Sequence, residues 1–412
     1  MRSTLRTIAL IGTGLTFIVA AIIRGPAGFA GERAAPAAYA INDFGLRLLR
    51  TLADGKGPNV IISPISVSLA LAMTYNGAAG ATRLAMAQAL DIEAMQDHLN
   101  ESNQALLEIL KDADPAVKIA IANALWAQKG FSIEPDFVKI GRDFYGAPIR
   151  NLDFEGNPDR AASIINQWVD HHTDGKIPKI IDNPDPQTRI VLTDAVYFKG
   201  KWTTPFNPHA TRPSPFHDSA GNTIQTPMMR QARSFDYLSN DDFQAVRLPY
   251  GNQRFMMYIF LPRKTDGLPD FLGSLDEAHL RRWSTAFANR KGVLALPKFT
   301  LTYKAKLNDA LKQMGMNVAF SDDADFSRMH QPPPPPPPFR ITDVEHRTYI
   351  KVEEKGTEAA AATNVSVSVA LALIREPPPF ELVVDHPFFL AIGEQESGAL
   401  LFAGVVTNPS GP

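Results

Sequence analysis

The 412-residue sequence contains no cysteine, so disulfide bonds and thiolate chemistry are both excluded. It also lacks the G-x-S-x-G motif of serine hydrolases, the H-E-x-x-H motif of zinc proteases and the G-x-x-x-x-G-K-[ST] phosphate loop. The formal net charge of −2 gives no reason to expect a nucleic acid or an anionic membrane as a partner. We therefore predict a protein that is not an enzyme and that needs no cofactor or metal ion.

The rest of the composition is that of an ordinary globular protein, with 45% hydrophobic and 20% charged residues. A chain of this length can form one large domain or two smaller ones. No linker-like stretch divides the sequence, so we predict a single domain over residues 36–412. Long β-rich runs are mixed irregularly with helical segments, and this pattern predicts an α+β fold.

The first 30 residues have the pattern of a secretory signal peptide. Arg2 and Arg6 precede an apolar run, Thr7–Ile23, and small residues follow up to Ala30. The run nearly reaches the length that spans a membrane, so an uncleaved membrane anchor is the alternative. In both cases we expect the bulk of the chain to be exported, to the extracellular space or to a periplasm.

Local patterns predict the helices and strands. Ser63 before Pro64 is typical of a helix N-cap with proline in the first turn, and segment 65–75 is apolar nearly all round, which predicts a buried helix. Further helices are predicted near 36–53, 82–91, 103–112, 134–143 and 159–172, and strands near 117–127, 190–198, 244–248, 255–261, 293–302, 347–353, 382–392 and 399–406.

The segment from Val352 to Leu373 has features of both a loop and a strand. Apolar residues alternate with small or polar ones from Asn364 to Leu373, which indicates a strand with one buried face. Four consecutive alanines, Ala359–Ala362, favour a helix over a strand, and Gly356 provides a backbone hinge. The segment is therefore predicted to exist in two states, as a mobile loop or as a strand.

The residues VEEKGTEAAAAT that begin this segment resemble the hinge of the reactive-centre loop in serpins, the serine protease inhibitor family. The resemblance recurs in family order across roughly residues 37–410. It implies three β-sheets surrounded by eight or nine helices, with an exposed loop over about residues 354–379. The matching stretches are NVIISPISVSLALAMTYNGA (59–78), TDGKIPKII (173–181), LTDAVYFKGKW (192–202), PMM (227–229), LPKF (296–299), DHPFF (385–389) and LFAGVVTNP (401–409).

The resemblance implies an inhibitor that acts as a suicide substrate. A target serine protease would attack the loop and form an acyl-enzyme, and the cleaved loop would insert into the central sheet with the protease covalently attached. Side chains at alternate positions from Thr357 to Val369 would face the core, and all are small or apolar. The implied hinge residues are Glu354, Gly356, Thr357, Glu358, Ala359, Ala360, Ala361, Ala362 and Thr363.

The resemblance also indicates where the protease cuts. Counting from the hinge glutamate Glu354 places the scissile bond between Ala370 and Leu371, and the small Ala370 suits an elastase-like protease. A trypsin-like cut between Arg375 and Glu376 is the alternative. We favour Ala370, because a cut at Arg375 would leave slack in the chain that tethers the protease.

Asp194 lies in the middle of the apolar run IVLTDAVYF, where a buried carboxylate needs a partner. The family usually has asparagine at this position, hydrogen-bonded to a histidine that His346 matches here. By the same resemblance Ser63 and Ser66 lie nearby, and Trp202 supports the opening of the sheet. Lys298 and Glu354 match a family ion pair where the loop enters.

A non-inhibitory serpin that binds a ligand or a client protein is the alternative function. Such members often carry proline, charged or bulky residues at inward hinge positions, and this sequence has none there. Segment 92–112 contains only Lys111 as a lysine or arginine, which argues against activation by heparin. We expect a monomer whose partner is the target protease.

Three smaller features complete the prediction. The prolines Pro332–Pro338 must be extended, and we interpret them as an exposed insertion. Asn100 and Asn364 fit the glycosylation pattern, which is common by chance. His171 and His172 are adjacent on a predicted helix and do not face the same way, so we do not expect them to share a metal ion.

Overall fold

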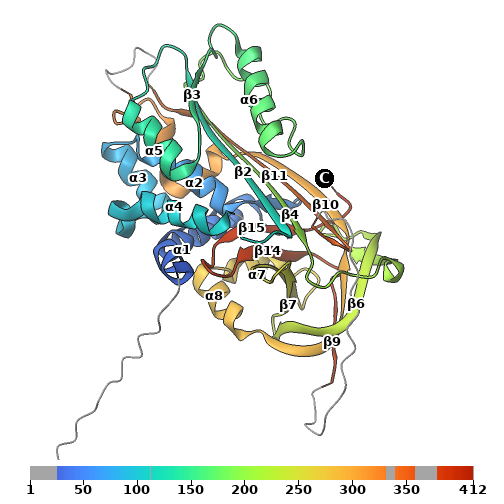
Figure 1. Ribbon diagram of the computed structural model, residues 1–412. Helices are drawn as coiled ribbons and strands as arrows, with labels where there is room; N and C mark the ends of the chain where they lie inside the picture. Colours follow the sequence, from blue (N-terminus) through green and yellow to red (C-terminus); the bar gives the residue numbers. More distant parts are fainter. Residues whose placement is uncertain (1–25, 112, 331–338, 358–377, 412) are drawn as a thin grey trace, which may run out of the picture.

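The structure is a computed structural model that describes residues 26–111, 113–330, 339–357 and 378–411. Within these ranges the chain forms nine α-helices and fifteen β-strands in an α+β arrangement (Figure 1). The α-helices are α1 (Pro26–Leu52), α2 (Pro64–Tyr75), α3 (Gly80–Leu90), α4 (Leu99–Leu110), α5 (Pro135–Tyr145), α6 (Pro158–His172), α7 (Leu268–Ser274), α8 (Glu277–Ala286) and α9 (Asn308–Leu311).

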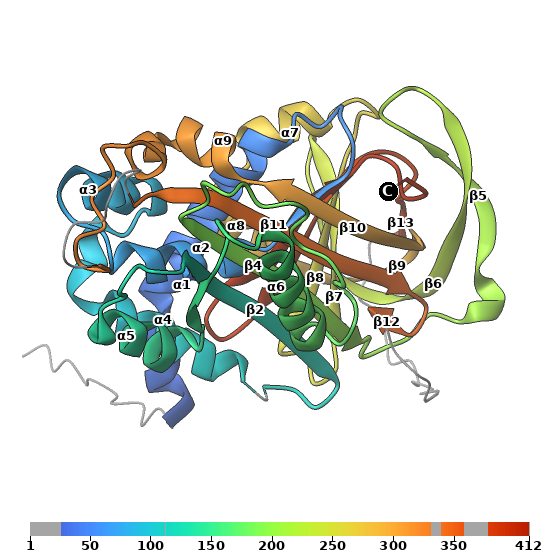
Figure 2. The same ribbon diagram turned by 90° about the horizontal axis from the view of Figure 1, so that it is seen from above.

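The central feature is a six-stranded sheet in the order β10-β11-β12-β4-β2-β3. Its long strands run side by side through the middle of the molecule, with α6 on one face and the remaining helices and strands on the other (Figures 1 and 2). The strands are β2 (Val117–Gln128), β3 (Ile149–Leu152), β4 (Ile190–Lys201), β10 (Phe299–Lys306), β11 (Ile341–Glu353) and β12 (Gly356–Thr357).

A second, nine-stranded sheet packs beneath the first. Hydrogen bonds join its strands in the order β1-β15-β14-β8-β7-β6-β9-β13, and β5 pairs with β6. The strands are β1 (Val60–Ile62), β5 (Arg212–His217), β6 (Thr223–Ser239), β7 (Phe243–Tyr250), β8 (Phe255–Pro262), β9 (Ala288–Pro297), β13 (Phe380–Val383), β14 (Phe388–Glu394) and β15 (Leu400–Val406).

The predicted third sheet is a part of this nine-stranded sheet. The long strand β6 pairs with β5 and β9 along most of its length, but with β7 only over its last residues, Asp236–Ser239. Strands β5, β6, β9 and β13 thus form one curved layer, and β1, β15, β14, β8 and β7 form another. The three-sheet architecture is therefore present, with two of the sheets joined through the end of β6.

Two predicted strands were wrong because each spans a boundary between elements. The run 293–302 divides at Lys298 into β9, in the nine-stranded sheet, and β10, in the six-stranded sheet. The run 382–392 divides into β13 and β14, which lie at different places in the nine-stranded sheet, beside β9 and beside β15 and β8. A continuous hydrophobic run cannot show that the chain passes from one sheet to the next, because both halves have a buried face.

Helix α1 begins ten residues before the predicted helix start at Pro36, and it includes residues 26–30 of the predicted signal peptide. Residues 1–25 lie outside the described part of the chain, so the signal peptide stays a prediction. Within the described residues, none of the helices combines the length and the hydrophobicity needed to cross a membrane.

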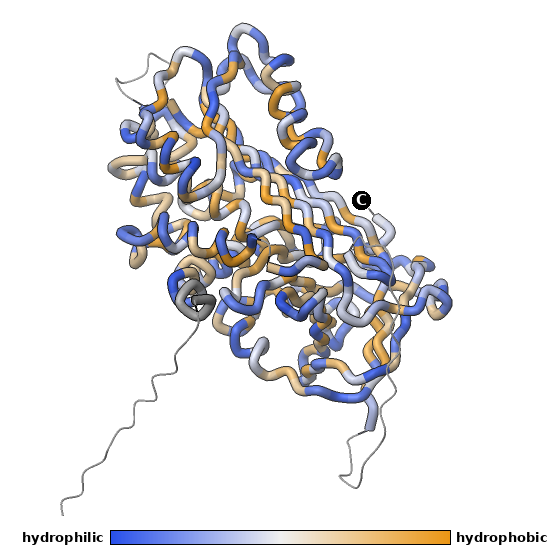
Figure 3. Tube along the Cα trace, viewed as in Figure 1, coloured by the Kyte–Doolittle hydropathy of each residue, from blue (hydrophilic) through white to orange (hydrophobic). Residues whose placement is uncertain are grey.

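Helix α2 forms as the sequence predicts, and it lies in the centre of the molecule. The hydroxyl of Ser63 accepts a hydrogen bond from the backbone N–H of Ser66 at 3.4 Å, and Pro64 is the first helical residue. All twelve residues of α2 are buried. The hydrophobic segments follow the inner helices and the strands, as Figure 3 shows along the chain.

The two faces of the six-stranded sheet belong to two separate hydrophobic cores. The large core lies between this sheet, α1, α2 and the nine-stranded sheet. A smaller core lies on the opposite face, where side chains of β2 and β4 pack against α6 and the residues that follow it, including Trp126, Ile165 and Ile177. We call this second face the outer face.

Candidate functional site

The candidate site lies where β4 and β11 meet in the middle of the six-stranded sheet. Residues 344–349 of β11 pair directly with residues 192–197 of β4, and the two strands run parallel. Beyond Tyr349 the short strand β12 lies between them, antiparallel to both. Thr357 of β12 is opposite Val352 on one side and Gly200 on the other. We call the direct β4–β11 pairing the seam.

Thr357, which begins the series of alternate positions predicted to face the core after insertion, is already inside the sheet. The residue is fully buried, and its Oγ1 lies 2.7 Å from the hydroxyl of Tyr250 on β7. Either hydroxyl can donate this hydrogen bond. Burial raises the pKa of Tyr250, so its hydroxyl keeps its proton at neutral pH. The start of the predicted loop is thus held in the sheet at rest.

Gly356 is the residue whose conformation lets β12 form. Its φ is +144°, which residues with a side chain rarely adopt, and a Cβ atom here would overlap the carbonyl oxygen of Gly200. The sequence prediction of a backbone hinge at this glycine agrees with that geometry. Any larger residue would disturb both the chain direction and the pairing with β4.

Glu354 and Lys298 meet at the end of the sheet where β12 enters, as the resemblance implies. Lys298 Nζ lies 2.8 Å from Glu354 Oε2, and the hydroxyl of Thr211 donates to Glu354 Oε1 at 2.7 Å. Burial acts to raise the pKa of Glu354, but the hydrogen bonds from Lys298 and Thr211 outweigh it and lower that pKa. The glutamate is therefore ionised at neutral pH and fixes the last turn before β12.

Trp202 fixes the same turn from the other side. Its indole Nε1 donates to the carbonyl of Glu353 at 2.9 Å, and its backbone N–H donates to the carbonyl of Lys355 at 3.1 Å. The ring stacks on Tyr250, with centroids 4.3 Å apart and planes at 15°. Trp202 thereby connects the turn to the tyrosine that holds Thr357.

Asp194 and His346 lie opposite each other in the register of the seam. Both are fully buried, and Asp194 Oδ1 is 3.2 Å from His346 Nδ1. The contact is close but is not aligned as a hydrogen bond, and neither carboxylate oxygen has a hydrogen-bond partner among the described residues. A polar pair that makes no hydrogen bond between its members is a weak point in a buried sheet.

The proton on His346 can be located from its other nitrogen. The backbone N–H of Ser63 donates to His346 Nε2 at 3.2 Å, so Nε2 must carry a lone pair. A neutral imidazole then has its proton on Nδ1, facing Asp194. A doubly protonated imidazolium would place two N–H groups against each other and break the bond to Ser63.

Ser66 binds Asn123 of β2, a residue that the sequence analysis missed. The Ser66 hydroxyl donates to Asn123 Oδ1 at 2.6 Å, and Asn123 Nδ2 donates to the Ser66 carbonyl at 2.7 Å. Asn123 lies in the apolar run VKIAIANALWA and carries the same signal that identified Asp194. Tyr250 and Thr211 were also missed, and nothing in their local sequence marks them.

The predicted site residues therefore form two groups along the seam. Lys298, Glu354, Trp202, Gly356 and Thr357 gather at the end where β12 enters, and Ser63, Ser66, Asp194 and His346 gather further along. Outside the described residues lie Glu358–Thr363 of the hinge, both candidate scissile bonds (Ala370–Leu371 and Arg375–Glu376), Pro332–Pro338 and Asn364.

The structure argues against glycosylation at Asn100. Its side-chain amide donates to Asn76 at 3.1 Å and accepts from the hydroxyl of Tyr145 at 2.7 Å. Ser102, the third residue of the pattern, is buried in α4. Among the described residues there is also no group of three or more His, Asp or Glu side chains placed to hold a metal ion.

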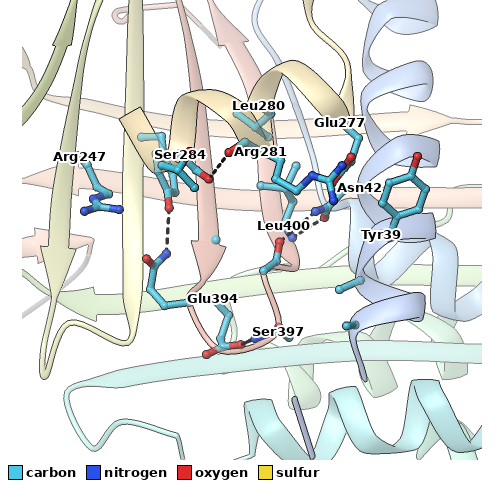
Figure 4. A pocket seen from close by; sticks show the side chains of 17 residues that line it. Tyr39, Asn42, Arg247, Glu277, Leu280, Arg281, Ser284, Glu394, Ser397 and Leu400 are labelled. Carbon is cyan, nitrogen blue, oxygen red and sulfur yellow. Dashed lines mark hydrogen bonds and ion pairs between the residues drawn. The ribbon is translucent and has the colours of Figure 1, made fainter. Parts of the chain in front are cut away.

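A pocket of about 420 Å³ lies away from the seam, between α1, α8 and the β14–β15 turn (Figure 4). Glu277 on α8 is nearly buried there, its Oε2 has no hydrogen-bond partner among the described residues, and its Oε1 is 3.8 Å from Arg281 Nε. Burial raises the pKa of Glu277, and the Glu277 charge raises the pKa of Tyr39 across the pocket. The carboxyl group of Glu277 is therefore incompletely satisfied, and its unpartnered oxygen is buried in the protein.

Comparison with known proteins assigns residues 39–409 to the family model "Serpin (serine protease inhibitor)". An uncharacterised serpin-like protein of the archaeon Thermococcus kodakarensis is 39% identical over 376 residues, covering 91% of this chain and 86% of its own. Serpin-ZXA of Oryza sativa subsp. japonica is 34% identical, covering 89% and 96%.

Solved structures agree with these sequence relatives. The native state of tengpin, a thermophilic serpin, superposes with a TM-score of 0.82 at 28% identity, covering 90% of this chain and 94% of its own. Human thyroxine-binding globulin in complex with thyroxine superposes with a TM-score of 0.82 at 26% identity, covering 92% of this chain and 100% of its own. The likeness extends over nearly the whole described fold.

Proposed function

This chain belongs to the serpin family, and we propose that it inhibits serine proteases as a suicide substrate. In this mechanism the protease cleaves the segment between β12 and β13 and remains attached as an acyl-enzyme. The cleaved segment then continues β12 as a full strand between β4 and β11. The attached protease is carried along the sheet and distorted before deacylation.

The position of β12 is the observation that supports this proposal most directly. Gly356 and Thr357 already occupy the first positions of a strand between β4 and β11. A strand that continued in the same register would be antiparallel to both neighbours. Six residues beyond Thr357, Thr363 would then lie between His346 and Asp194, at the weak point of the seam.

The energetics favour insertion. The new strand would gain two hydrogen-bonded ladders where one parallel ladder is lost, each bond contributing about 0.5–1.5 kcal/mol. Its inward valines Val365, Val367 and Val369 would each contribute on the order of 1.5–3 kcal/mol by burial. The inserted state is therefore the deeper minimum, and the resting state is metastable.

We assign the target to an elastase-like serine protease, with cleavage between Ala370 and Leu371. The small side chain of Ala370 supports this choice. A trypsin-like enzyme that cuts between Arg375 and Glu376 is the competing assignment. The two assignments differ in the mass of the released C-terminal peptide, which begins at Leu371 in the first case and at Glu376 in the second.

The test incubates the purified protein with elastase-like, chymotrypsin-like and trypsin-like proteases. We expect a complex with an elastase-like enzyme that survives denaturing electrophoresis, together with release of a peptide beginning at Leu371. Cleavage of the loop by every protease without any stable complex would contradict the inhibitory function. A stable complex with trypsin and a peptide beginning at Glu376 would overturn the assignment of the scissile bond.

The pocket beside Glu277 favours a second candidate function, the binding of a small ligand. One structural relative is named a thyroxine-binding globulin, a protein that binds a small ligand. The pocket is lined by the carboxyl-bearing Glu277 and by Tyr39, which suit a ligand with an amine or hydroxyl donor. A ligand screen by thermal shift, with Glu277→Gln as the comparison, tests this function separately from protease trapping.

We also propose that the protein is exported. Arg2, Arg6 and the apolar run Thr7–Ile23 support this. Cleavage after Ala30 would leave Gly31 as the first residue and keep the buried part of α1, from Ala34 onward, intact. The N-terminal sequence of the protein recovered outside the cell checks this: Gly31 supports it, and Met1 indicates an uncleaved anchor.

A further inference from the structure

Residues 173–189, which connect α6 to β4, cross the outer face of the six-stranded sheet. We call them the crossing segment. Near its start, Asp174 Oδ2 lies 2.5 Å from Lys118 Nζ on β2. Further along, Asp182 Oδ2 lies 2.5 Å from Lys304 Nζ on β10, beyond β4 and β11 in the strand order. The segment therefore extends from one side of the seam to the other.

The crossing segment is firmly attached to α6. Asn166 of α6 accepts hydrogen bonds from the backbone N–H groups of Ile180 and Ile181, at 2.8 and 3.0 Å, and donates to the carbonyl of Ile181. Ile177, Ile180 and Ile181 are buried in the small outer core. Asp182 is the next residue, so its backbone position is set by the hydrogen bonds to Asn166 and by the buried isoleucines.

Opening the seam would divide the sheet into two parts. Strand β4 stays with β2, to which it pairs from Ile190 to Gly200, and the crossing segment leads directly into it. Strand β10 pairs only with β11 among the described strands, so these two move together. The contact of Asp182 with Lys304 joins the two parts, whereas the contact of Asp174 with Lys118 lies within one part.

Other contacts of the crossing segment also span the seam. The backbone N–H of Arg189 donates to Thr342 Oγ1 of β11 at 2.9 Å, and Lys176 Nζ lies 5.7 Å from the centre of the Tyr349 ring. The Asp182 contact is the one ion pair of the described segment that reaches the far strand β10. It connects the support of β4 to the strand on the far side of β11, so it must break or stretch when β4 and β11 separate.

We propose that Asp182 and Lys304 form a latch that slows the separation of β4 and β11, and that they are thereby positioning residues for strand insertion. The functional meaning of the latch rests on the inhibitory mechanism proposed above. The latch is charged across the physiological range, because hydrogen bonds from Lys179 and Lys304 lower the pKa of Asp182 to about 2. Its side chains are 59% and 35% exposed, so its contribution is modest and sensitive to salt.

The test measures hydrogen exchange of the intact protein without any protease. Asp182→Asn keeps the shape of the side chain and removes its charge, and Asp174→Asn is the control for loss of an exposed ion pair of the same length. Asp182 also lies 2.8 Å from Lys179 inside the crossing segment, and Lys304→Gln, which keeps that contact, separates the two. We expect Asp182→Asn to speed exchange of the β11 amides about two- to five-fold, the range of a surface ion pair. Asp174→Asn should leave them unchanged.

Lys304→Gln and the double variant Asp182→Asn with Lys304→Gln complete a double-mutant cycle for this ion pair. If the ion pair carries the effect, the double variant exchanges no faster than either single variant. High salt should remove the difference between wild type and Asp182→Asn. Equal effects of Asp182→Asn and Asp174→Asn, or exchange of β11 at the wild-type rate in Asp182→Asn, would overturn the latch.

A second measurement separates the latch from the inhibitory function. With a trapped protease, Asp182→Asn should speed formation of the stable complex by a similar factor, while Asp174→Asn should not. Faster β11 exchange in Asp182→Asn together with a wild type that traps no protease would leave the latch standing and refute inhibition. Normal trapping with unchanged exchange would refute the latch alone.

Discussion

Replacing Tyr250 with phenylalanine tests whether a single hydrogen bond holds the hinge in the sheet at rest. The tyrosine hydroxyl is 2.7 Å from Thr357 Oγ1, and both residues are fully buried. Phenylalanine keeps the aromatic ring that stacks on Trp202 at 4.3 Å, so the substitution removes the hydroxyl with little change in packing. Thr357 is then left with a buried hydroxyl that has lost this partner.

An unsatisfied buried hydroxyl costs about 1–3 kcal/mol. The cost falls on the state in which Thr357 is inside the sheet, because water can hydrate the hydroxyl once β12 leaves. The equilibrium should therefore shift toward the released hinge by about 5- to 150-fold. Hydrogen exchange at Gly356 and Thr357 reports this shift directly, since both amides lie in the two-residue strand β12.

The double variant Tyr250→Phe with Thr357→Val is the control. It removes both hydroxyls and leaves neither unsatisfied, so exchange at the hinge should return close to the wild-type rate. If Tyr250→Phe alone exchanges at the wild-type rate, the hydrogen bond does not hold the hinge. If the hinge amides of the double variant exchange as fast as those of Tyr250→Phe alone, Tyr250 acts through packing and our reasoning about the hydroxyl is wrong.

Three further predictions follow from the seam. Thr357→Arg should place an unpaired charge in the sheet, so the variant should be cut without trapping the protease; undiminished complex formation would refute strand insertion. Single and double alanine variants of Asp194 and His346 should be coupled in thermal unfolding, and strictly additive shifts would show that the contact carries no energy. Burial, reinforced by Asp343, raises the pKa of Glu345 to about 7, so wild-type stability should fall as pH rises from about 4.5 to 7, by up to about 3 kcal/mol. Glu345→Gln should lack this fall, measured as the difference in Tm between pH 5 and pH 8; an equal fall in both proteins would contradict the shift.

The sign of the pH prediction follows from the proton count. Between pH 4.5 and 7 the folded protein keeps the proton on Glu345 and the unfolded chain has lost it. Raising the pH therefore favours the unfolded chain until the folded glutamate also ionises. Below about pH 4.5 both states are protonated, and above about pH 7 both are ionised, so this group adds no further slope outside that window.

The sequence identified the buried polar pair of the seam, Asp194 and His346, but not the resting position of the hinge. Asp194 could be identified because a carboxylate in an apolar run needs a partner, and the family resemblance supplied His346. The two-residue strand β12 is too short to produce any periodic pattern. Its partner Tyr250 is 107 residues away from Thr357, and a contact over that separation is set by the packing of the two sheets.

The contacts of the crossing segment could not be predicted from local sequence patterns either. The motif TDGKIPKII could be identified, and the periodicity predicted α6 to within one residue. Asp174 and Asp182 reach opposite sides of the seam because of the strand order β10-β11-β12-β4-β2. No local sequence pattern contains that order. Long-range strand order is therefore what separates two chemically similar aspartates into a proposed latch and its control.

The two anchors of the loop explain why the proposed insertion waits for cleavage. The segment that must insert begins at β12, in the six-stranded sheet, and ends at β13, which pairs with β9 from Phe380 to Val383 in the other sheet. Leu382 is fully buried and Phe380 stacks on Tyr237 at 3.9 Å, so this second anchor is not released at low cost. A full strand that runs along the seam, away from β13, can form only when its far end is free. In the proposed mechanism a protease that cuts the loop would supply that freedom, and the energy of the two new ladders would become available while the acyl bond still holds the enzyme.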